Sequence, residues 1–171
     1  ELQGAAKARF AAIQERQAEL SQQFSEHVLD ATDQWSLVVS AEELEGVPPD
    51  VLSATRQAAQ ADQREGHKLT LKMPCYLPIM QYAKSSHLRE KLYRAYVTRA
   101  SDQADTQFAE LDNGKLIQEI LQLRQEEATL LGYQNFAEVS VATKMADSPA
   151  KVIAFLRDLS MRARPFAEKD L

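Results

Sequence analysis

The sequence has 171 residues and a formal net charge of −5 at pH 7, with 44% hydrophobic and 26% charged residues. This length suffices for one domain with a hydrophobic core, and the composition is that of an ordinary globular protein. The acidic balance argues against a nucleic-acid partner, because DNA- and RNA-binding surfaces need a basic excess to neutralise phosphates.

No run approaches the roughly 18–20 apolar residues of a membrane span, so we expect no membrane partner. The single cysteine, Cys75, cannot form an internal disulfide, which fits a reducing, cytoplasmic location. The sequence starts without Met, its first residues do not form a signal peptide, and residues 166–171 continue a helical pattern without a cap. We therefore expect a piece of a longer chain.

The first half of the sequence predicts two helices and two strands. Apolar residues at steps of three and four predict a long helix over about residues 5–33. Aromatic and β-branched residues at 35–39 and an alternating pattern at 68–73 predict two strands. A helix at about 50–64 lies between them, opened by prolines. Residues 35–73 are thus predicted as a β-helix-β insertion.

The second half predicts helices over residues 76–83, 86–101, 112–131 and 135–145, and a last one that starts at Pro149 and is bent by Pro165. Residues 102–112 are expected to form an exposed loop. One apolar set is predicted to face inward from the helix at 112–131: Leu116, Ile117, Ile120, Leu121, Ala128 and Leu131. The last helix is predicted to carry an apolar stripe of Val152, Phe155, Leu156, Leu159, Ala163 and Phe166. The predicted fold class is mainly α, an antiparallel helical array with a small two-stranded β insertion, forming a single helical region over residues 1–171.

The histidines lack the spacing of a hydrolytic zinc site, which typically uses three protein ligands, often with two histidines one helical turn apart. His27, His67 and His87 are 40 and 20 residues apart in the sequence. Glu90 lies one turn from His87, but a di-metal bundle needs two Glu-x-x-His motifs and further glutamates. We therefore predict no metal ligands here and expect solvated or locally hydrogen-bonded histidines.

No nucleophile motif is present either. The sequence contains neither a Gly-x-Ser-x-Gly elbow nor a glycine-rich phosphate loop. Ser85 and Ser86 are interpreted as a helix cap. Cys75 lies among apolar residues and is interpreted as a small buried hydrophobe, since a nucleophilic thiol needs a nearby histidine or cation. We therefore predict no catalytic residue in this chain.

The remaining polar and aromatic candidates have structural interpretations. The paired carboxylates at residues 42–43 and 126–127 point about 100° apart on a helix, so we expect solvated faces rather than an acid–base pair. We expect core and interface packing for the aromatics, since no basic groove surrounds them. Arg162 and Arg164 either meet an acidic partner or are solvated. The aromatic residues concerned are Tyr93, Tyr96, Tyr133 and Phe136.

Several segments together resemble the thimet oligopeptidase family of zinc metallopeptidases. In order along the chain they are VLDAT (28–32), MPCYLP (73–78), LYRAYVTRAS (92–101), Asp112-Asn113, EILQLR (119–124), LGYQNFA (131–137), ATKMA (142–146) and Ser148-Pro149. Their order and spacing, rather than any one segment, carry the resemblance, which extends from about residue 20 to the end. Residues 103–108 replace a glycine-rich link usual in the family, which leaves the shape of that loop open.

The resemblance implies a parent of roughly four times this length, in which a His-Glu-x-x-His helix and a downstream Glu bind zinc and the motif Glu serves as general base. None of these residues is in this sequence, so the resemblance assigns no catalytic, metal-binding or substrate-binding residue here. It implies that the chain is a non-catalytic wall of a channel that admits short peptides, with the remaining domains of the same polypeptide as its partners.

Two alternatives remain open at this point. The chain is expected to be a standalone helical adaptor without enzymatic activity if its gene ends near Leu171, whereas a reading frame that reaches His-Glu-x-x-His supports the peptidase. Apolar surface that normally meets missing lobes would also make the chain self-associate.

Overall fold

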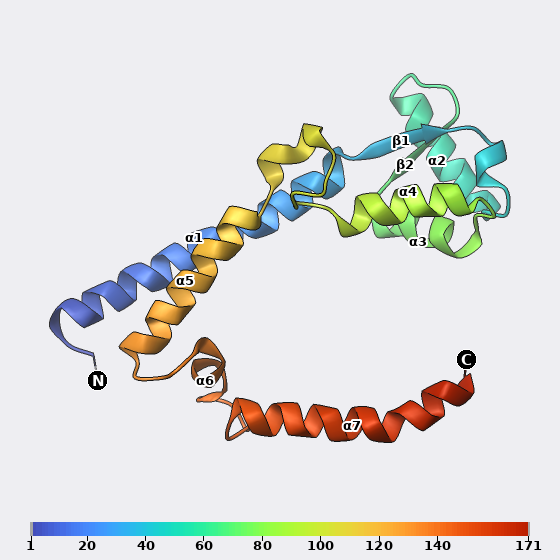
Figure 1. The fold of residues 1–171 in the computed structure, drawn as a ribbon. Helices are drawn as coiled ribbons and strands as arrows, with labels where there is room; N and C mark the ends of the chain where they lie inside the picture. Colours follow the sequence, from blue (N-terminus) through green and yellow to red (C-terminus); the bar gives the residue numbers. More distant parts are fainter. Residues whose placement is uncertain (1, 171) are drawn as a thin grey trace. The chain divides into compact units, whose positions relative to one another are not determined.

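The structure is a computed structural model that describes residues 2–170. The chain is mainly helical with a small two-stranded sheet, as Figure 1 shows, which confirms the predicted fold class. Its elements are α1 (Gly4–Gln34), β1 (Ser36–Val39), the 3-10 helix η1 (Glu42–Leu44), α2 (Pro49–Ala61), β2 (His67–Thr70), α3 (Met73–Tyr82), α4 (Ser86–Val97), the 3-10 helix η2 (Thr106–Leu111), α5 (Gly114–Leu130), α6 (Phe136–Val141) and α7 (Pro149–Asp170).

The described chain divides into two compact units. One contains the residues up to Glu19 together with those from Gln118 onward, and the other contains Leu20–Ile117. We call them the terminal unit and the central unit. The predicted single helical region over residues 1–171 and its insertion at 35–73 stay predictions.

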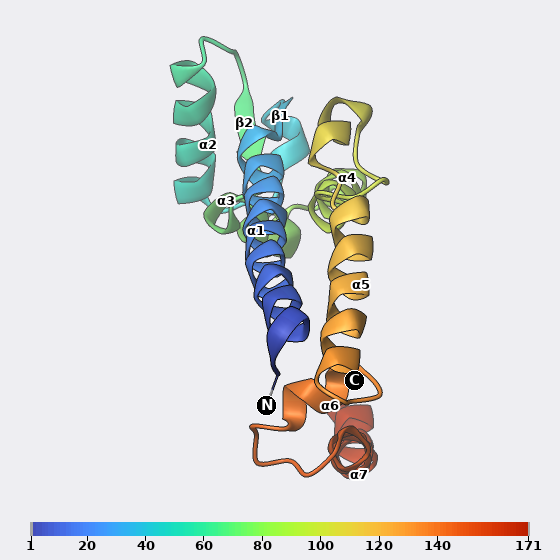
Figure 2. The ribbon, with the colours of Figure 1, turned by 90° about the vertical axis from the view of Figure 1, so that its left-hand side faces the viewer.

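The sheet of the central unit is an antiparallel pair with α2 between its strands in the sequence. Ser36 pairs with Thr70 and Val39 with His67. Helix α2 lies alongside β2, as Figure 2 shows. Gly66 leads into β2 with a φ of +93°, and a Cβ at this position would lie 2.6 Å from the Val39 carbonyl oxygen, so the approach to the strand pair requires glycine.

The core of the central unit gathers side chains from the sheet, α3, α4 and η2. Each fully buried leucine or isoleucine contributes about 1.5–3 kcal/mol relative to an exposed one, so this cluster is the main source of stability of the unit. Its buried members are Trp35, Val39, Leu44, Val47, Leu69, Leu71, Tyr76, Ile79, Ala83, Leu88, Leu92 and Phe108.

Proline and serine set several boundaries. Pro74 occupies the first turn of α3, so the predicted strand at 68–73 ends at Thr70 and Met73 already begins the helix. The Ser85 hydroxyl accepts a hydrogen bond from the Leu88 amide at 3.2 Å and caps α4, as predicted. Helix α4 ends at Val97, earlier than predicted.

Two further predictions of length were wrong. The expected loop at 102–112 contains η2, whose Phe108 is buried in the core. The expected helix at 135–145 ends at Val141, although Asn135 caps its start through the Glu138 amide at 3.2 Å. The buried Phe108 anchors η2, and the Asn135 cap fixes the start of α6. Hydrophobic periodicity over so few residues does not predict such contacts.

In the terminal unit, the first part of α1 lies alongside α5, as Figures 1 and 2 show. Ile13, Leu123 and Ala128 are buried there. The inward stripe predicted for α5 was wrong in part, because Leu121 is 58% exposed and Leu131 is also exposed. In the central unit Ile117, from the same predicted stripe, is exposed as well.

Helix α7 carries its predicted apolar stripe on the surface. Phe155 is 65% exposed and Phe166 is 68% exposed, and only Val152 among the six predicted residues is half-buried. An apolar stripe shows which face of a helix gains from burial, but not whether a partner lies beside it. Pro165 lies inside α7, and the last turns of the helix depart from its axis in Figure 1.

Candidate functional site

The three histidines lie in different elements and have separate surroundings. The His27 ring on α1 is hydrogen-bonded through Nδ1 to Asn113 Oδ1 at 2.9 Å. His67 on β2 is buried, not solvated, and its Nδ1 is hydrogen-bonded to the Thr55 hydroxyl at 3.0 Å. His87 on α4 is exposed. Each of the three histidines is therefore hydrogen-bonded or exposed, as predicted. The burial of His67 was not predicted.

These residues do not fit a zinc site. A hydrolytic zinc ion needs three protein ligands converging within about 2.0–2.3 Å of one point. Within residues 2–170 no group of three or more His, Cys, Asp or Glu side chains converges in this way. We therefore derive no chemical step through zinc from the side chains of this chain.

The other nucleophile candidates also have structural surroundings. The Cys75 sulfur packs partly buried against the core and accepts a hydrogen bond from the Thr70 amide at 3.4 Å. The exposed Glu43 carboxylate accepts a hydrogen bond from the Ser40 amide at 3.0 Å, just before η1. Each of these contacts is made to a backbone amide within five residues.

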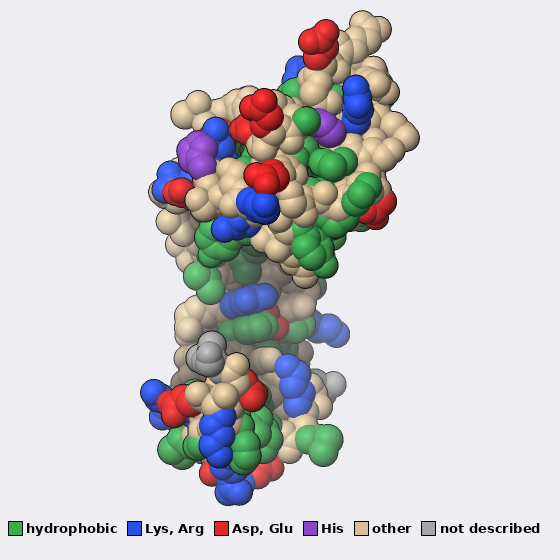
Figure 3. All heavy atoms as spheres, turned by 90° about the vertical axis from the view of Figure 1, so that its right-hand side faces the viewer, with side chains coloured by type: hydrophobic (Ala, Val, Ile, Leu, Met, Phe, Trp, Pro, Cys, Tyr) green, Lys and Arg blue, Asp and Glu red, His purple; other side chains and the backbone are tan. Residues whose placement is uncertain are grey.

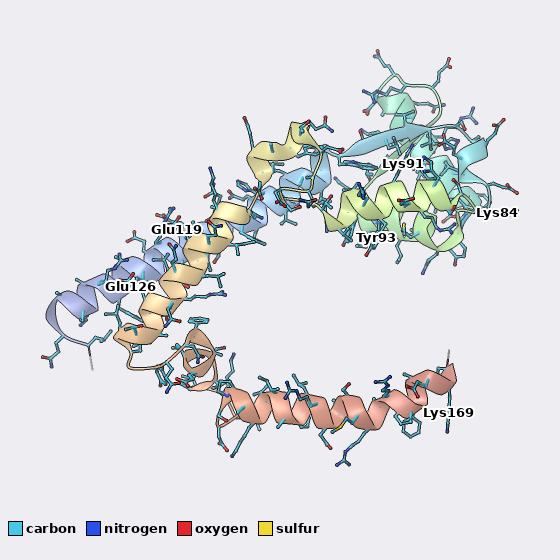
Figure 4. The ribbon with its side chains drawn as sticks, in the orientation of Figure 1. Lys84, Lys91, Tyr93, Glu119, Glu126 and Lys169 are labelled. Atoms are coloured by element: carbon cyan, nitrogen blue, oxygen red, sulfur yellow. The ribbon has the colours of Figure 1, made fainter. Side chains whose placement is uncertain are left out.

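The carboxylates at 126–127 were predicted to form a solvated face, and the structure corrects this. The Arg9 guanidinium donates two hydrogen bonds of 2.6 Å to Glu126, and Arg16 binds Glu119 in the same two-pronged way. Figure 4 shows Glu119 and Glu126 on α5. These guanidinium groups lower the pKa of both carboxyls, mainly through hydrogen bonding.

Glu127 is buried, with 7% exposure, and accepts a hydrogen bond of 2.7 Å from the Gln17 side-chain amide. Arg9 and Arg16 are seven residues apart on α1, as are their partners Glu126 and Glu119 on α5, so these two-turn spacings set the register of the two helices. Sequence reasoning treated α1 and α5 separately, and for that reason missed their pairing.

The aromatic candidates behave differently from one another. Tyr96 stacks on Tyr76 with a ring-centroid distance of 4.3 Å, and burial raises the pKa of the Tyr76 phenol. Phe136 lies 4.9 Å from the Arg124 guanidinium carbon. Tyr93 is 54% exposed and Tyr133 is also exposed, so neither packs in the core of the described chain, and interface packing stays a prediction for these two.

Arg162 and Arg164 are exposed and pair within their own helix. Arg162 binds Asp158 and Arg164 binds Glu168, each one helical turn away. Both predicted interpretations therefore hold in part, since the two arginines are solvated and also have acidic neighbours.

The central unit contains a pocket of about 360 Å³ that the sequence did not predict. Helix α4 contributes one face of it through residues at positions 91, 94, 95 and 98, and the end of α1, β1 and the η2 region close the remaining sides. Trp35 and Phe108 supply aromatic walls. The full lining is Ala31, Trp35, Ser36, Leu37, Leu71, Lys91, Arg94, Ala95, Thr98, Arg99, Gln103, Ala104, Asp105, Gln107 and Phe108.

Positive charge dominates this pocket. Lys91, Arg94 and Arg99 line it, against a single carboxylate from Asp105. The signal available in the sequence was the one-turn spacing of Lys91 and Arg94 followed by Arg99. It was missed because the acidic total of the whole chain suggested no local basic site, and only folding brings the aromatic walls to these cations.

An asparagine, Asn113, holds the start of α5 in the central unit. It is 1% exposed, its side-chain amide donates to the Phe24 carbonyl at 3.1 Å, and its backbone amide donates to the Ala100 carbonyl at 3.0 Å. With the His27 contact, the residue joins α1, the end of the α4 segment and α5. Its role is to position these segments.

The described residues form helices and a small two-stranded sheet, and comparison with known proteins identifies the family of the chain. A family model for peptidase family M3 matches residues 79–171, more than half of the chain, and the chain therefore belongs to this family. This confirms the resemblance to thimet oligopeptidases.

The similar proteins are oligopeptidases. The chain is 49% identical to oligopeptidase A of Escherichia coli over 95% of the chain and 24% of that protein. It is 42% identical to an organellar oligopeptidase A of Arabidopsis thaliana, over 95% of the chain and 21% of that protein. It is 29% identical to saccharolysin of Saccharomyces cerevisiae, over 79% of the chain and 18% of that protein. The chain thus spans about a quarter or less of the length of these relatives. No helix in the described part of the chain is both long and apolar enough to cross a bilayer.

Proposed function

We propose that this chain is a non-catalytic helical part of a zinc-dependent oligopeptidase that hydrolyses short peptides, and that it forms part of the wall of the substrate channel. The observation that carries the proposal is the 49% identity to oligopeptidase A of Escherichia coli along 95% of the chain. Identity at this level over almost every element supports a common fold and a common place in a peptidase. A cytoplasmic location belongs to the same proposal.

The non-catalytic role is supported by the surroundings of the candidate ligands. His27 and His67 are engaged with Asn113 and Thr55, and both ring contacts use Nδ1. One ring lies on α1 and the other on β2, and within residues 2–170 neither belongs to a group of three or more potential metal ligands. The proposed zinc chemistry therefore belongs to polypeptide beyond this sequence.

A hydrolysis assay tests the proposal. Purified chain is incubated with internally quenched peptides of about ten residues, with added zinc, without zinc and with a chelator. Oligopeptidase A of Escherichia coli serves as the positive control. We expect no turnover by the chain alone in all three conditions, because no described set of side chains activates water at a metal. Chelator-sensitive turnover that follows the chain through successive purification steps would overturn the non-catalytic role.

The exposed stripe of α7 supports a second element of the proposal, namely that other domains of the same polypeptide cover this face. Figure 3 shows hydrophobic side chains among charged ones on α7, at the bottom of the view. Exposed apolar side chains of this size usually mark a contact surface. The large side chains of this stripe that are exposed are Phe155, Leu156, Leu159 and Phe166.

Without that cover, we expect the chain to self-associate through α7. Light scattering over a concentration series should show a rising average mass for the unmodified chain and a lower mass for the double variant Leu156→Glu, Leu159→Glu. The control Ala154→Glu adds a carboxylate to the opposite face of the helix and should leave association unchanged. A strictly monomeric unmodified chain would contradict the assignment of α7 as a covered face.

A further inference from the structure

Two of the cations that line the basic pocket of the central unit have no side-chain partner among the described residues. Lys91 and Arg94 line it, and neither side chain has an ion pair or hydrogen bond to another described residue. Several other cations of the described chain have acidic partners, as Lys68 has Asp62 and Lys84 has Glu45. Figure 4 shows Lys91 leaving α4 on the side opposite to Tyr93.

The residues that line the pocket carry a net positive charge. Three cations line the pocket, against the Asp105 carboxylate and the carbonyl end of α4, which carries about half a negative charge. The excess is therefore about one and a half positive charges. One negative charge on a ligand neutralises most of this excess, so a second negative charge on the same ligand gains less than the first.

Arg99 is held in place before any ligand arrives. Its Nε donates to the Tyr96 carbonyl at 2.8 Å, and one Nη donates to the Thr32 hydroxyl at 2.6 Å. Its guanidinium carbon lies 3.8 Å from the centre of the Tyr96 ring, which in turn stacks on Tyr76. The second Nη group remains as a donor of fixed position, and a fixed donor loses little entropy when it binds.

The pocket also has an apolar wall and a limited size. Trp35 and Phe108 line it beside Ala95 and Leu71. A volume of about 360 Å³ lies at the lower end of the range for small-molecule sites, roughly 300–1,000 Å³. This space accepts one or two residues of an extended peptide and excludes a folded chain.

From this combination we propose that the pocket binds the free C-terminal carboxylate of a short peptide. Lys91, Arg94 and the free Nη of Arg99 receive the carboxylate, and the last side chain of the peptide packs against Trp35 and Phe108. The identity of the ligand as a peptide rests on the proposed oligopeptidase function. The preference for a single carboxylate beside an apolar group rests on the pocket alone.

Trp35 provides a direct readout, because it is the only tryptophan of the chain and it lines the pocket. The probe is N-acetyl-alanyl-phenylalanine, compared with the same dipeptide amidated at its C-terminus and with inorganic phosphate. We expect a saturable change in Trp35 fluorescence with the free acid at concentrations on the order of a millimolar. Amidation should weaken binding by about tenfold or more, because it removes the charge that the cations receive.

Two variants locate the site. Lys91→Gln and Arg94→Gln should each weaken binding of the free acid about fivefold or more, and both residues are exposed, so the fold tolerates the changes. Arg56→Gln makes the same charge change on the exposed surface of α2, outside the pocket, and should leave binding unchanged. Isothermal titration calorimetry on the same set gives the affinities without relying on the fluorophore.

Equal binding of the acid and the amide, equal binding of phosphate and the peptide acid, or insensitivity to both pocket variants would each overturn the proposal. Because the chain is assayed for binding alone, these results are independent of peptide hydrolysis. Failure of the pocket leaves the oligopeptidase assignment in place, and turnover by the isolated chain would overturn only its non-catalytic role.

Discussion

Replacing Asn113 with alanine should lower the free energy of unfolding of the central unit by about 2–4 kcal/mol. The side chain is 1% exposed and makes two hydrogen bonds, to the Phe24 carbonyl and the His27 ring. Each bond contributes about 0.5–1.5 kcal/mol, and removing a fully buried amide adds the cost of the cavity that it leaves. The Phe24 carbonyl lies inside α1 and the His27 ring is only half-buried, so neither partner is left fully unsatisfied, which keeps the effect from being larger.

The measurement is chemical denaturation followed by Trp35 fluorescence, because Trp35 is buried in the same unit as Asn113 and reports its unfolding. The control Gln60→Ala removes an exposed amide from α2 and should change the midpoint little. A double-mutant cycle with His27→Ala should give a coupling energy of about 0.5–1.5 kcal/mol. A loss below about 0.5 kcal/mol for Asn113→Ala would refute the assignment of this residue as the junction of the unit.

Three other outcomes are expected from the same structure. Arg16 lowers the pKa of Glu119, so the pair stabilises the folded chain above the ordinary carboxyl pKa of about 4.3, and this contribution is lost as the pH falls through the lowered folded-state pKa. NMR titration of Arg16→Gln should return that pKa to its ordinary range, and an unchanged value would argue against the ion pair in solution. Gly46→Ala should destabilise the central unit by more than about 1 kcal/mol, because φ is +94° and the new Cβ would clash with the Tyr82 carbonyl oxygen. An unchanged melting temperature would contradict the positive φ at this position. Leu92→Ala should cost about 2–5 kcal/mol in urea denaturation, since Leu92 is fully buried in the core, whereas the neighbouring exposed Lys91→Ala should cost less than about 0.5 kcal/mol.

Local chemistry allowed most of the elements to be predicted. The long apolar repeat of α1, the alternation in β2, the prolines at the starts of α2, α3 and α7, and the serine cap of α4 all act within a few residues of where they stand. One region that was predicted wrongly, residues 102–112, depends on distant residues. Phe108 gives η2 its buried anchor by packing against a core made largely by segments before residue 93.

The features of the candidate site that could be predicted are also local in the sequence, and the others depend on distant residues. The absence of a histidine pair at one-turn spacing was visible in the sequence, because ligand spacing on a helix is a local property. The basic pocket was not, since Trp35 and Arg94 are far apart in the sequence and meet only when β1 and α4 come together. Glu127 is a similar case, because its burial depends on Gln17, which lies on another helix.

The sequence by itself therefore determined the helical class, the position of the strand pair and membership of an oligopeptidase family, because each of these is written in patterns within single segments or in their order. Only the tertiary structure decided which carboxylates are paired, which cations remain unpaired, and which apolar stripe is buried. Burial and electrostatic pairing are properties of residues that folding brings together, and two stripes of equal amphipathicity differ only in whether another surface lies against them.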